Sequence, residues 1–190
     1  MTALPDLLDR AWTALEAGAA PGRSRFSMVY LATTGLDGAP RLRTVVLRRA
    51  DRAAGTAGFN TDLRSPKIAE MRAEPRAALL GYDMEAGFQV RLEGRARLLP
   101  QDGAAWEAAL PRSRICYRHA YAPGSRLERP EDGDPTEAMI APEDADSGLP
   151  NFCAVDLLIE RLEALDLSAT GHRRAEYRAT EGWAGRWLAP

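Results

Sequence analysis

Two arginines occupy opposite faces of one apolar segment, residues 41–49 (RLRTVVLRR). If the segment is a strand, side chains alternate between its faces, and Arg43 shares a face with Val45 and Leu47. Arg48 then lies on the other face. A half-buried guanidinium needs an anion, and its planar fork suits the oxygens of a phosphate or a carboxylate. The alternative is that each arginine, near a strand end, reaches solvent or an internal carboxylate.

A second segment, residues 59–67 (FNTDLRSPK), combines hydroxyl groups with a lysine at a predicted helix start. Ser65 at the N-cap and Pro66 at the first helical position are typical of such a start. Lys67 would lie in the first turn, where its ammonium and free N–H groups can together hold a phosphate. A lysine at the positive end of the helix dipole is unfavourable by itself, which favours an anionic partner. The alternative is an exposed lysine, and without a GxxxxGK loop a nucleoside triphosphatase is not indicated.

Five other residues carry weaker signals. Gln89 lies on the polar face of an alternating segment, a position that is ordinarily on the surface. His119 and His172 lack a carboxylate or hydroxyl at the spacing of a nucleophile motif. Cys116 and Cys153 have no second cysteine or histidine at metal-ligand spacing, so we expect two buried free thiols. The sequence predicts no metal site.

The elements that must position these residues are mostly strands. Alternation and β-branched composition predict strands at residues 27–34, 41–49, 57–61, 76–82, 88–98, 172–178 and 183–188. Apolar spacing and capping signals predict helices at residues 4–18, 65–71 and 101–110. Many strands, few helices and no alternating βαβ order indicate an antiparallel sheet or barrel.

Two segments leave the pattern open. Residues 152–167 suit a helix by the spacing of their leucines and suit strands by their β-branched and alternating parts, and periodicity alone favours the helix. Residues 128–150 are acidic and contain several prolines, which indicates a long irregular excursion.

Length and composition limit the classes of protein. A chain of 190 residues with 45% hydrophobic content buries a sizeable core, and its length favours a single domain spanning residues 1–190. The net charge of −2 argues against broad binding to nucleic acid, although 25 basic residues can gather around a small anion. No apolar run approaches the roughly 20 residues that cross a bilayer. The first residues lack the basic and apolar parts of a secretion signal, so we expect a cytoplasmic protein.

Four short motifs, in this order and spacing, resemble those of the pyridoxamine 5′-phosphate oxidases. They are RTVVLR at residues 43–48, FNTDLRSPK at 59–67, EPRA at 74–77 and FQVRLEG at 88–94. The final residues, 174–177 and 187–190, are also similar to the end of that family. The resemblance implies a mainly β fold with flanking helices, a six-stranded antiparallel Greek-key split barrel that forms a homodimer. It also implies flavin mononucleotide (FMN) between the subunits, and it favours strands over residues 152–167.

The resemblance assigns a set of cofactor-binding residues. They are Arg43, Thr44, Val45, Val46, Arg48, Asn60, Thr61, Arg64, Ser65, Lys67, Gln89 and Arg174. By position, Arg43 and Lys67 match residues that hold the flavin phosphate, and Thr61 matches a hydroxyl beside it. The resemblance further implies that Val45 and Val46 offer backbone groups to the ring. Gln89 would contact the polar edge of the ring, and Arg174 would complete the site from near the C-terminus.

Departures from the family affect the phosphate and substrate sites. Ser65-Pro66-Lys67 stands where the family has Ser-Arg-Lys, and Arg64 is a candidate replacement for the missing arginine. Residues that grip the substrate phosphate align with Arg48, Trp106, Leu110 and Arg114. Trp106 and Leu110 lack the needed groups, so we expect a poor fit for pyridoxamine 5′-phosphate, with Trp106 offering an apolar wall to a less anionic substrate.

The resemblance leaves one candidate catalytic residue and three functional alternatives. His172 matches a substrate-side histidine, although Thr170 stands where the family has an arginine. The leading hypothesis is an FMN-dependent oxidoreductase in which a small organic substrate delivers a hydride to the flavin. A non-catalytic flavin-binding or flavin-sensing protein on the same barrel is the alternative. A split barrel that binds haem or a deazaflavin is the third.

Overall fold

The computed structural model describes residues 3–22, 24–134, 136, 146–168 and 171–190. Its strands are β1 (Met28–Thr34), β2 (Pro40–Asp51), β3 (Thr56–Asp62), β4 (Arg76–Asp83), β5 (Phe88–Pro100), β6 (Phe152–Asp166), β7 (Arg173–Arg178) and β8 (Gly185–Leu188). Its α-helices are α1 (Leu4–Ala19), α2 (Pro66–Ala73), α3 (Gly103–Ala108) and α4 (Pro111–Arg114). Short 3₁₀ turns are η1 (Ile115–Arg118), η2 (Pro130–Gly133), η4 (Leu149–Asn151) and η5 (Ala179–Glu181). No helix among the described residues is long and apolar enough to span a membrane.

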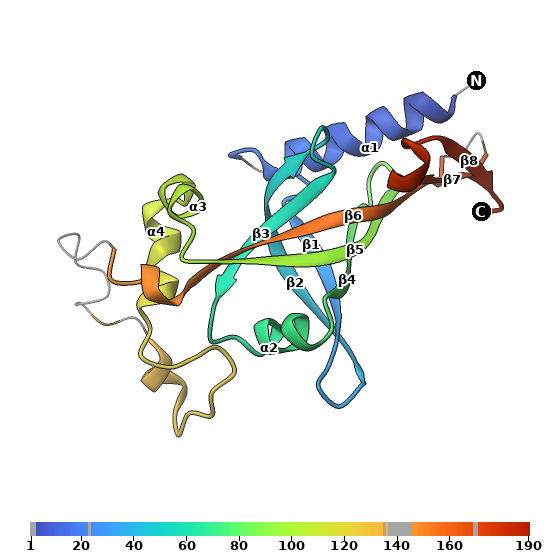
Figure 1. The fold of residues 1–190 in the computed structure, drawn as a ribbon. Coiled ribbons are helices and arrows are strands. Elements are labelled where there is room, and N and C mark those ends of the chain that lie inside the picture. Colours follow the sequence, from blue (N-terminus) through green and yellow to red (C-terminus); the bar gives the residue numbers. More distant parts are fainter. Residues whose placement is uncertain (1–2, 23, 135, 137–145, 169–170) are drawn as a thin grey trace.

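Six antiparallel strands close into a barrel (Figure 1). They follow the order β3-β2-β1-β4-β5-β6, and β6 closes the ring by pairing with β3. The long β6 also pairs with β7, and β8 follows β7, so a ribbon extends beyond the barrel. The antiparallel split-barrel fold predicted from the motifs is therefore confirmed, and residues 152–166 form a strand rather than a helix.

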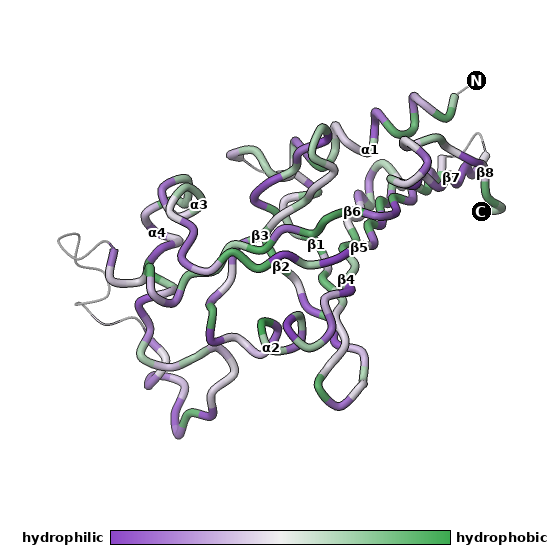
Figure 2. The backbone as a smooth tube through the Cα atoms, viewed as in Figure 1, coloured by the Kyte–Doolittle hydropathy of each residue, from purple (hydrophilic) through white to green (hydrophobic). Residues whose placement is uncertain are grey.

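The barrel interior holds the main hydrophobic core. Apolar and polar residues alternate along the strands, as Figure 2 shows, so that one face of each strand is buried. Helix α1 packs Leu7, Ala11 and Leu15 onto this core, and the ring of Trp12 meets Trp183 edge to face at 6.5 Å. Burial of this apolar stripe holds α1 against the barrel.

The ladder between β2 and β3 covers only part of β2. Pairing begins at Leu47 opposite Phe59 and ends at Asp51 opposite Thr56, with one extra residue on β2 between Leu47 and Arg49. On its other edge β3 pairs with β6 along its whole length, from Thr56 opposite Leu158 to Asp62 opposite Phe152. Residues 40–46 of β2 therefore pair with β1 but present their other edge to no strand of the described residues. We call this stretch the open edge of β2.

Several sequence predictions need correction. The helix predicted at residues 101–110 is shorter, since Asp102 caps α3 by accepting a hydrogen bond from the Ala105 N–H (2.7 Å) and Pro111 starts α4. Cys153 is buried but Cys116 is exposed, because the neighbouring Tyr117 takes the inward position on η1. Residues 128–150 carry short turns, and the rest of this excursion lies outside the described residues.

Candidate functional site

The lysine predicted at the start of α2 lies beside two hydroxyl groups. Lys67 Nζ donates to Thr61 Oγ1 (3.0 Å) and to Ser65 Oγ (2.6 Å). Each hydroxyl accepts from the ammonium and donates to no other described residue, so its proton is available to a ligand oxygen. Ser65 stands at the predicted N-cap position, but its side chain makes no cap hydrogen bond because it binds Lys67. The third ammonium proton and the two hydroxyls supply donors for one anion.

Arg43 adds a guanidinium to this group. Its Nη2 donates to Glu70 Oε2 (2.8 Å), and its Nη1 donates to Thr33 Oγ1 (2.5 Å). Glu70 is buried on α2, one helical turn after Lys67. Burial lowers the pKa of Lys67, and the positive charge of Arg43 lowers it further, while Glu70 opposes the shift. We call Arg43, Thr61, Ser65 and Lys67 the cationic cluster. Such a cluster is stabilised when an anion shares it.

Arg64 does not belong to this cluster. Its Nε and Nη2 donate to the two carboxylate oxygens of Asp62 (3.0 and 2.7 Å), and Nη2 also donates to the His119 carbonyl. All three guanidinium nitrogens of Arg64 are engaged, since Nη1 donates to the Ala120 carbonyl (3.3 Å), whereas Arg43 keeps its Nε without a partner among the described residues. Replacement of the missing family arginine by Arg64 therefore finds no support in the geometry.

The open edge of β2 leads away from the cationic cluster. Val45 is buried inward, whereas Thr44 and Val46 are exposed on the outer face, as the alternation predicts. Because this edge has no partner strand, alternate peptide groups of residues 43–46 are available to a ligand. A flat molecule with polar groups on one edge can bind here as an added strand would.

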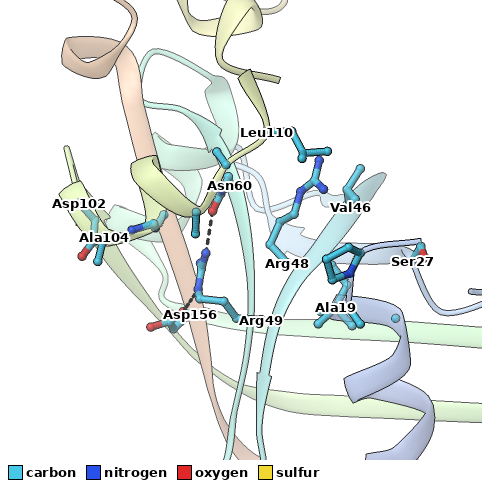
Figure 3. A pocket seen from close by; sticks show the side chains of 18 of the residues that line it. Ala19, Ser27, Val46, Arg48, Arg49, Asn60, Asp102, Ala104, Leu110 and Asp156 are labelled. Atoms are coloured by element: carbon cyan, nitrogen blue, oxygen red, sulfur yellow. Dashed lines mark hydrogen bonds and ion pairs between the residues drawn. The ribbon is translucent and has the colours of Figure 1, made fainter. Parts of the chain in front are cut away.

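A cavity of about 510 Å³ lies farther along β2 (Figure 3). Val46, Arg48 and Asn60 line it, together with the small residues of α3 and the segment after α1. Trp106 does not form its wall, contrary to expectation. Its ring packs against Phe152 at 5.2 Å and Tyr117 at 5.8 Å, and its Nε1 donates to Asp146 (2.7 Å). Trp106 is therefore a core residue of a second aromatic cluster.

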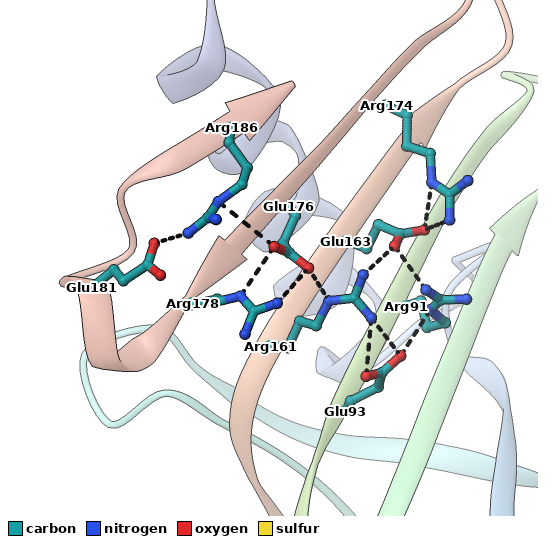
Figure 4. A network of polar contacts seen from close by, with 9 residues as sticks. All are labelled: Arg91, Glu93, Arg161, Glu163, Arg174, Glu176, Arg178, Glu181 and Arg186. Atoms are coloured by element: carbon teal, nitrogen blue, oxygen red, sulfur yellow. Dashed lines mark hydrogen bonds and ion pairs between the residues drawn. The ribbon is translucent and has the colours of Figure 1, made fainter. Parts of the chain in front are cut away.

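Gln89 and Arg174 lie on the outer face at increasing distance from the open edge. Strand register places both in one row across the sheet. The row reads Val46, Met28, Tyr82, Gln89, Leu165 and Arg174, with Met28 beside Tyr82 by continuation of the β1–β4 register. Five strand spacings of about 4.8 Å separate Val46 from Arg174, or about 24 Å along the sheet. Arg174 also donates to Glu163 Oε1 (2.9 Å) (Figure 4).

The C-terminal candidates thus lie apart from the others. His172 is exposed immediately before β7, and it does not line the cavity. Figure 1 shows β7 and β8 at the opposite end of the molecule from α3 and α4. Thr170 lies outside the described residues. Within one chain, the structure brings together the cationic cluster, the open edge and the cavity, but neither His172 nor Arg174.

Comparison with known proteins identifies the family. The family model for pyridoxamine 5′-phosphate oxidase matches residues 19–147. The chain belongs to the pyridoxamine 5′-phosphate oxidase family.

Named members of the pyridoxamine 5′-phosphate oxidase family align over most of this chain. Pyridoxine/pyridoxamine 5′-phosphate oxidase 2 of Arabidopsis thaliana is 31% identical over 169 residues, covering 82% of this chain and 83% of its own length. The Xanthomonas axonopodis enzyme is 34% identical over 174 residues, 86% of each chain. A Xylella fastidiosa relative is 40% identical over 108 residues, which cover 55% of this chain and 51% of that protein.

Two solved structures share the fold of this chain. An FMN-binding protein related to these oxidases from Nostoc punctiforme superposes with a TM-score of 0.74 at 22% identity, covering 96% of this chain and 95% of that one. PhzG from Burkholderia lata, solved with tetrahydrophenazine-1-carboxylic acid, gives a TM-score of 0.71 at 22% identity, with 100% and 94% coverage. At 22% identity, these superpositions show that this chain and the two solved proteins have the same fold.

Several residues of this family site were not singled out from the sequence. Glu70 lies three positions after Lys67, a spacing that places both on one helix face and could have indicated their proximity. Arg112 and Asp156 line the cavity but carried no local motif. Among the described residues, no group of three or more His, Cys, Asp or Glu is arranged to hold a metal ion.

Proposed function

We propose that this chain is an FMN-dependent oxidoreductase with a substrate site that differs from that of the pyridoxamine 5′-phosphate oxidases. The observation that carries the proposal is the cationic cluster at one end of the open edge of β2. The Lys67 ammonium lies within hydrogen-bond distance of the Thr61 and Ser65 hydroxyls, and Arg43 lies close enough to lower the pKa of Lys67. A phosphate monoester carries nearly two negative charges at neutral pH and accepts several hydrogen bonds. The donor set fits such a group.

Different parts of the site bind different parts of the cofactor and the substrate. The cationic cluster holds the flavin phosphate, and Glu70 keeps the Arg43 guanidinium in place. Peptide groups of Val45 and Val46 on the open edge orient the polar edge of the ring. FMN, when bound, supplies the hydride-accepting chemistry. The cavity beyond Val46 holds the substrate, and its small apolar side chains exclude water from the reacting atoms.

We also propose that the active form is a homodimer. Apolar side chains lie exposed on the outer face of β1, β2 and β4, and they are Met28, Tyr30, Leu42, Val46 and Tyr82, with 37–70% of their surface accessible. A contiguous apolar face of this kind is typical of a subunit interface. Two-fold pairing over this face gives each site access to Arg174 and His172 of the partner subunit. Light scattering should give about twice the mass of the 20.7 kDa chain.

Two measurements test the proposed function. The protein should bind FMN saturably, and the bound flavin should be reduced by at least one small organic reductant in the absence of oxygen. Saturable FMN binding without reduction by any of a panel of alcohols, amines and ring-reduced acids would favour the non-catalytic alternative. Absence of FMN binding would contradict the cofactor assignment.

The named relatives suggest the first substrate to test. Pyridoxamine 5′-phosphate should reduce the bound flavin slowly, because Leu110 offers no charge to its phosphate and Trp106 is buried in the core. Losing two charge-assisted contacts, each worth about 1.5–3 kcal/mol, lowers catalytic efficiency by two to four orders of magnitude. Stopped-flow mixing measures this rate. Rapid bleaching of the flavin at micromolar pyridoxamine 5′-phosphate would contradict this expectation and identify that compound as a substrate.

A further inference from the structure

Two consecutive arginines of β2 line the same cavity. Successive side chains of a regular strand point to opposite faces, but the extra residue between Leu47 and Arg49 forms a bulge here. A bulge re-aims side chains and often accompanies a functional site. Both Arg48 and Arg49 consequently line the cavity, as Figure 3 shows.

Arg49 is fully engaged with the protein. Its Nε donates to Asp156 Oδ1 (3.0 Å) and its Nη1 donates to Asn60 Oδ1 (2.7 Å). Its Nη2 donates to the carbonyls of Phe59 (3.1 Å) and Val155 (3.2 Å). Arg49 therefore joins β2 to β3 and β6 and is a structural arginine.

Arg48 and Arg112 differ from Arg49. Neither makes a hydrogen bond or ion pair with a described residue, and they line the cavity from β2 and α4. Asp156 is already paired with Arg49 and Arg97. The charged groups that line the cavity without an ion pair to a described residue are Arg48, Arg112 and Asp102, which leaves one net positive charge (two minus one). A monoanion balances that charge, whereas a dianion exceeds it.

Most of the remaining cavity wall is small and apolar. Its alanines are Ala19, Ala20, Ala104, Ala105, Ala108, Ala109 and Ala154, and Leu99, Leu110 and Pro21 extend the same surface. Alanine side chains leave space and donate no hydrogen bonds, so this wall suits a carbon skeleton. A volume of about 510 Å³ lies within the range of pockets for small molecules, and it admits an acid of one or two rings.

We propose that this cavity binds an apolar organic monocarboxylate as substrate, with Arg48 pairing its carboxylate and the alanines enclosing its carbon skeleton. The proposal rests on the proposed function for the role of substrate, but binding itself is independent of flavin. Arg112 contributes a second positive charge at the cavity. Arg48 is thus a specificity-determining residue, and Arg49 holds the strands that place it.

Calorimetric titration with three matched probes tests the ligand class. Benzoate is the monoanion, benzamide is its neutral counterpart and phenyl phosphate is the dianion. We expect saturable binding of benzoate at least 10-fold tighter than that of benzamide, and weaker binding of phenyl phosphate. Equal binding of benzoate and benzamide would overturn the proposal, and so would tighter binding of phenyl phosphate.

Two variants locate the bound probe. Arg48→Gln removes the unpaired charge and should raise the benzoate Kd about 10- to 100-fold, the loss of one charge-assisted hydrogen-bonded pair. Arg126→Gln changes an arginine that does not line the cavity and should leave the Kd unchanged. Ala109→Leu fills part of the wall and should weaken binding of 2-naphthoate more than that of benzoate. Unchanged benzoate affinity in Arg48→Gln would refute the assignment.

Repeating the titration on flavin-free and FMN-loaded protein separates this proposal from the proposed function. Benzoate should bind both forms. Displacement of benzoate by FMN would assign the cavity to the flavin and overturn the substrate proposal. Benzoate binding to a chain that fails to bind FMN would leave the carboxylate site standing and remove the proposed function.

Discussion

Basic side chains gather in two regions of this molecule, and the two regions differ in the partners that these side chains have. On the outer face of β5–β8, arginines alternate with carboxylates in a network that Figure 4 shows. We call this network the charge ladder, formed by Arg91, Glu93, Arg161, Glu163, Arg174, Glu176, Arg178, Glu181 and Arg186. Arg91, Arg161 and Arg174 all donate to the buried Glu163 at 2.7–2.9 Å. Around the cationic cluster and the cavity, by contrast, Lys67 donates only to hydroxyls, and Arg48 meets no acceptor among the described residues.

The difference separates structural charge from charge available to a ligand. In the charge ladder each buried carboxylate has several cationic partners. The cost of removing these positive and negative groups from water is therefore offset by ion pairs within the chain. In the cationic cluster and the cavity, positive groups exceed the carboxylates that face them. An anionic ligand completes the compensation there. Substitutions should therefore change stability in the charge ladder, apart from Arg174, which the proposed dimer also brings to the ligand site, and should change ligand affinity in the second region.

The largest effect should follow from Glu163→Gln. Glu163 is 3% exposed, and neutralising it leaves three arginines without their common carboxylate. Removing one partner of a buried ion pair costs about 3–5 kcal/mol of unfolding free energy. Urea unfolding measures the loss. Glu160→Gln is the matched control on the same strand, since Glu160 is 61% exposed with one partner, Arg95. Its cost should stay below about 0.5 kcal/mol, and equal costs would contradict the structural role of the charge ladder.

Gly58→Ala should also destabilise the fold. A Cβ at this position would lie 2.6 Å from Asp156 Oδ1 and 2.8 Å from Arg49 Nε, so the ion pair between them must shift. Overpacking of this kind costs about 1–3 kcal/mol. Gly103→Ala is the control, because nothing lies within 4 Å of its added Cβ. Thermal unfolding compares the two variants. A Gly58→Ala protein as stable as the wild type would show that the Arg49–Asp156 ion pair tolerates a Cβ at residue 58.

FMN affinity should decline at alkaline pH. Burial and the Arg43 charge lower the pKa of Lys67 from its ordinary 10.5, and a bound phosphate would raise it again. The complex then holds the proton more tightly than the free protein, so affinity is full below the lowered pKa and falls as pH rises through it. Titrations between pH 7 and 9.5 test this. In Lys67→Arg the charge persists, and the decline should disappear; an identical decline would assign it to another group.

The smallest stability effect should come from Arg48→Gln. Arg48 is exposed and makes no ion pair with a described residue, so the free energy of unfolding should change by less than about 0.5 kcal/mol. Urea unfolding beside the Glu163→Gln measurement completes the contrast. A loss as large as that of Glu163→Gln would place Arg48 among the structural arginines.

The strands were predictable because buried and exposed residues alternate along a strand, and the sequences of β2 and β5 follow this pattern closely. The candidate cofactor residues came from motif order, and the structure brings two of them, Lys67 and Thr61, into contact. The sequence does not show which side chains pair with each other when they are far apart along the chain. Asp62 lies two positions before Arg64 and could have indicated that this arginine is neutralised, but nothing near Arg49 indicates that Asp156, more than 100 positions away, holds it. Trp106 was placed in the cavity wall for the same reason, since its ring partner Phe152 is remote in sequence.

Titration of FMN into wild-type protein and Lys67→Gln tests the account most directly. The wild type should bind saturably, and the variant should lose about 1.5–3 kcal/mol of binding free energy, a 10- to 150-fold increase in Kd, through one lost charge-assisted contact. Its unfolding midpoint in urea, measured without flavin, should match that of the wild type. Equal affinity for FMN in the two proteins, or no saturable binding by the wild type, would contradict the assignment of the cationic cluster to the flavin phosphate.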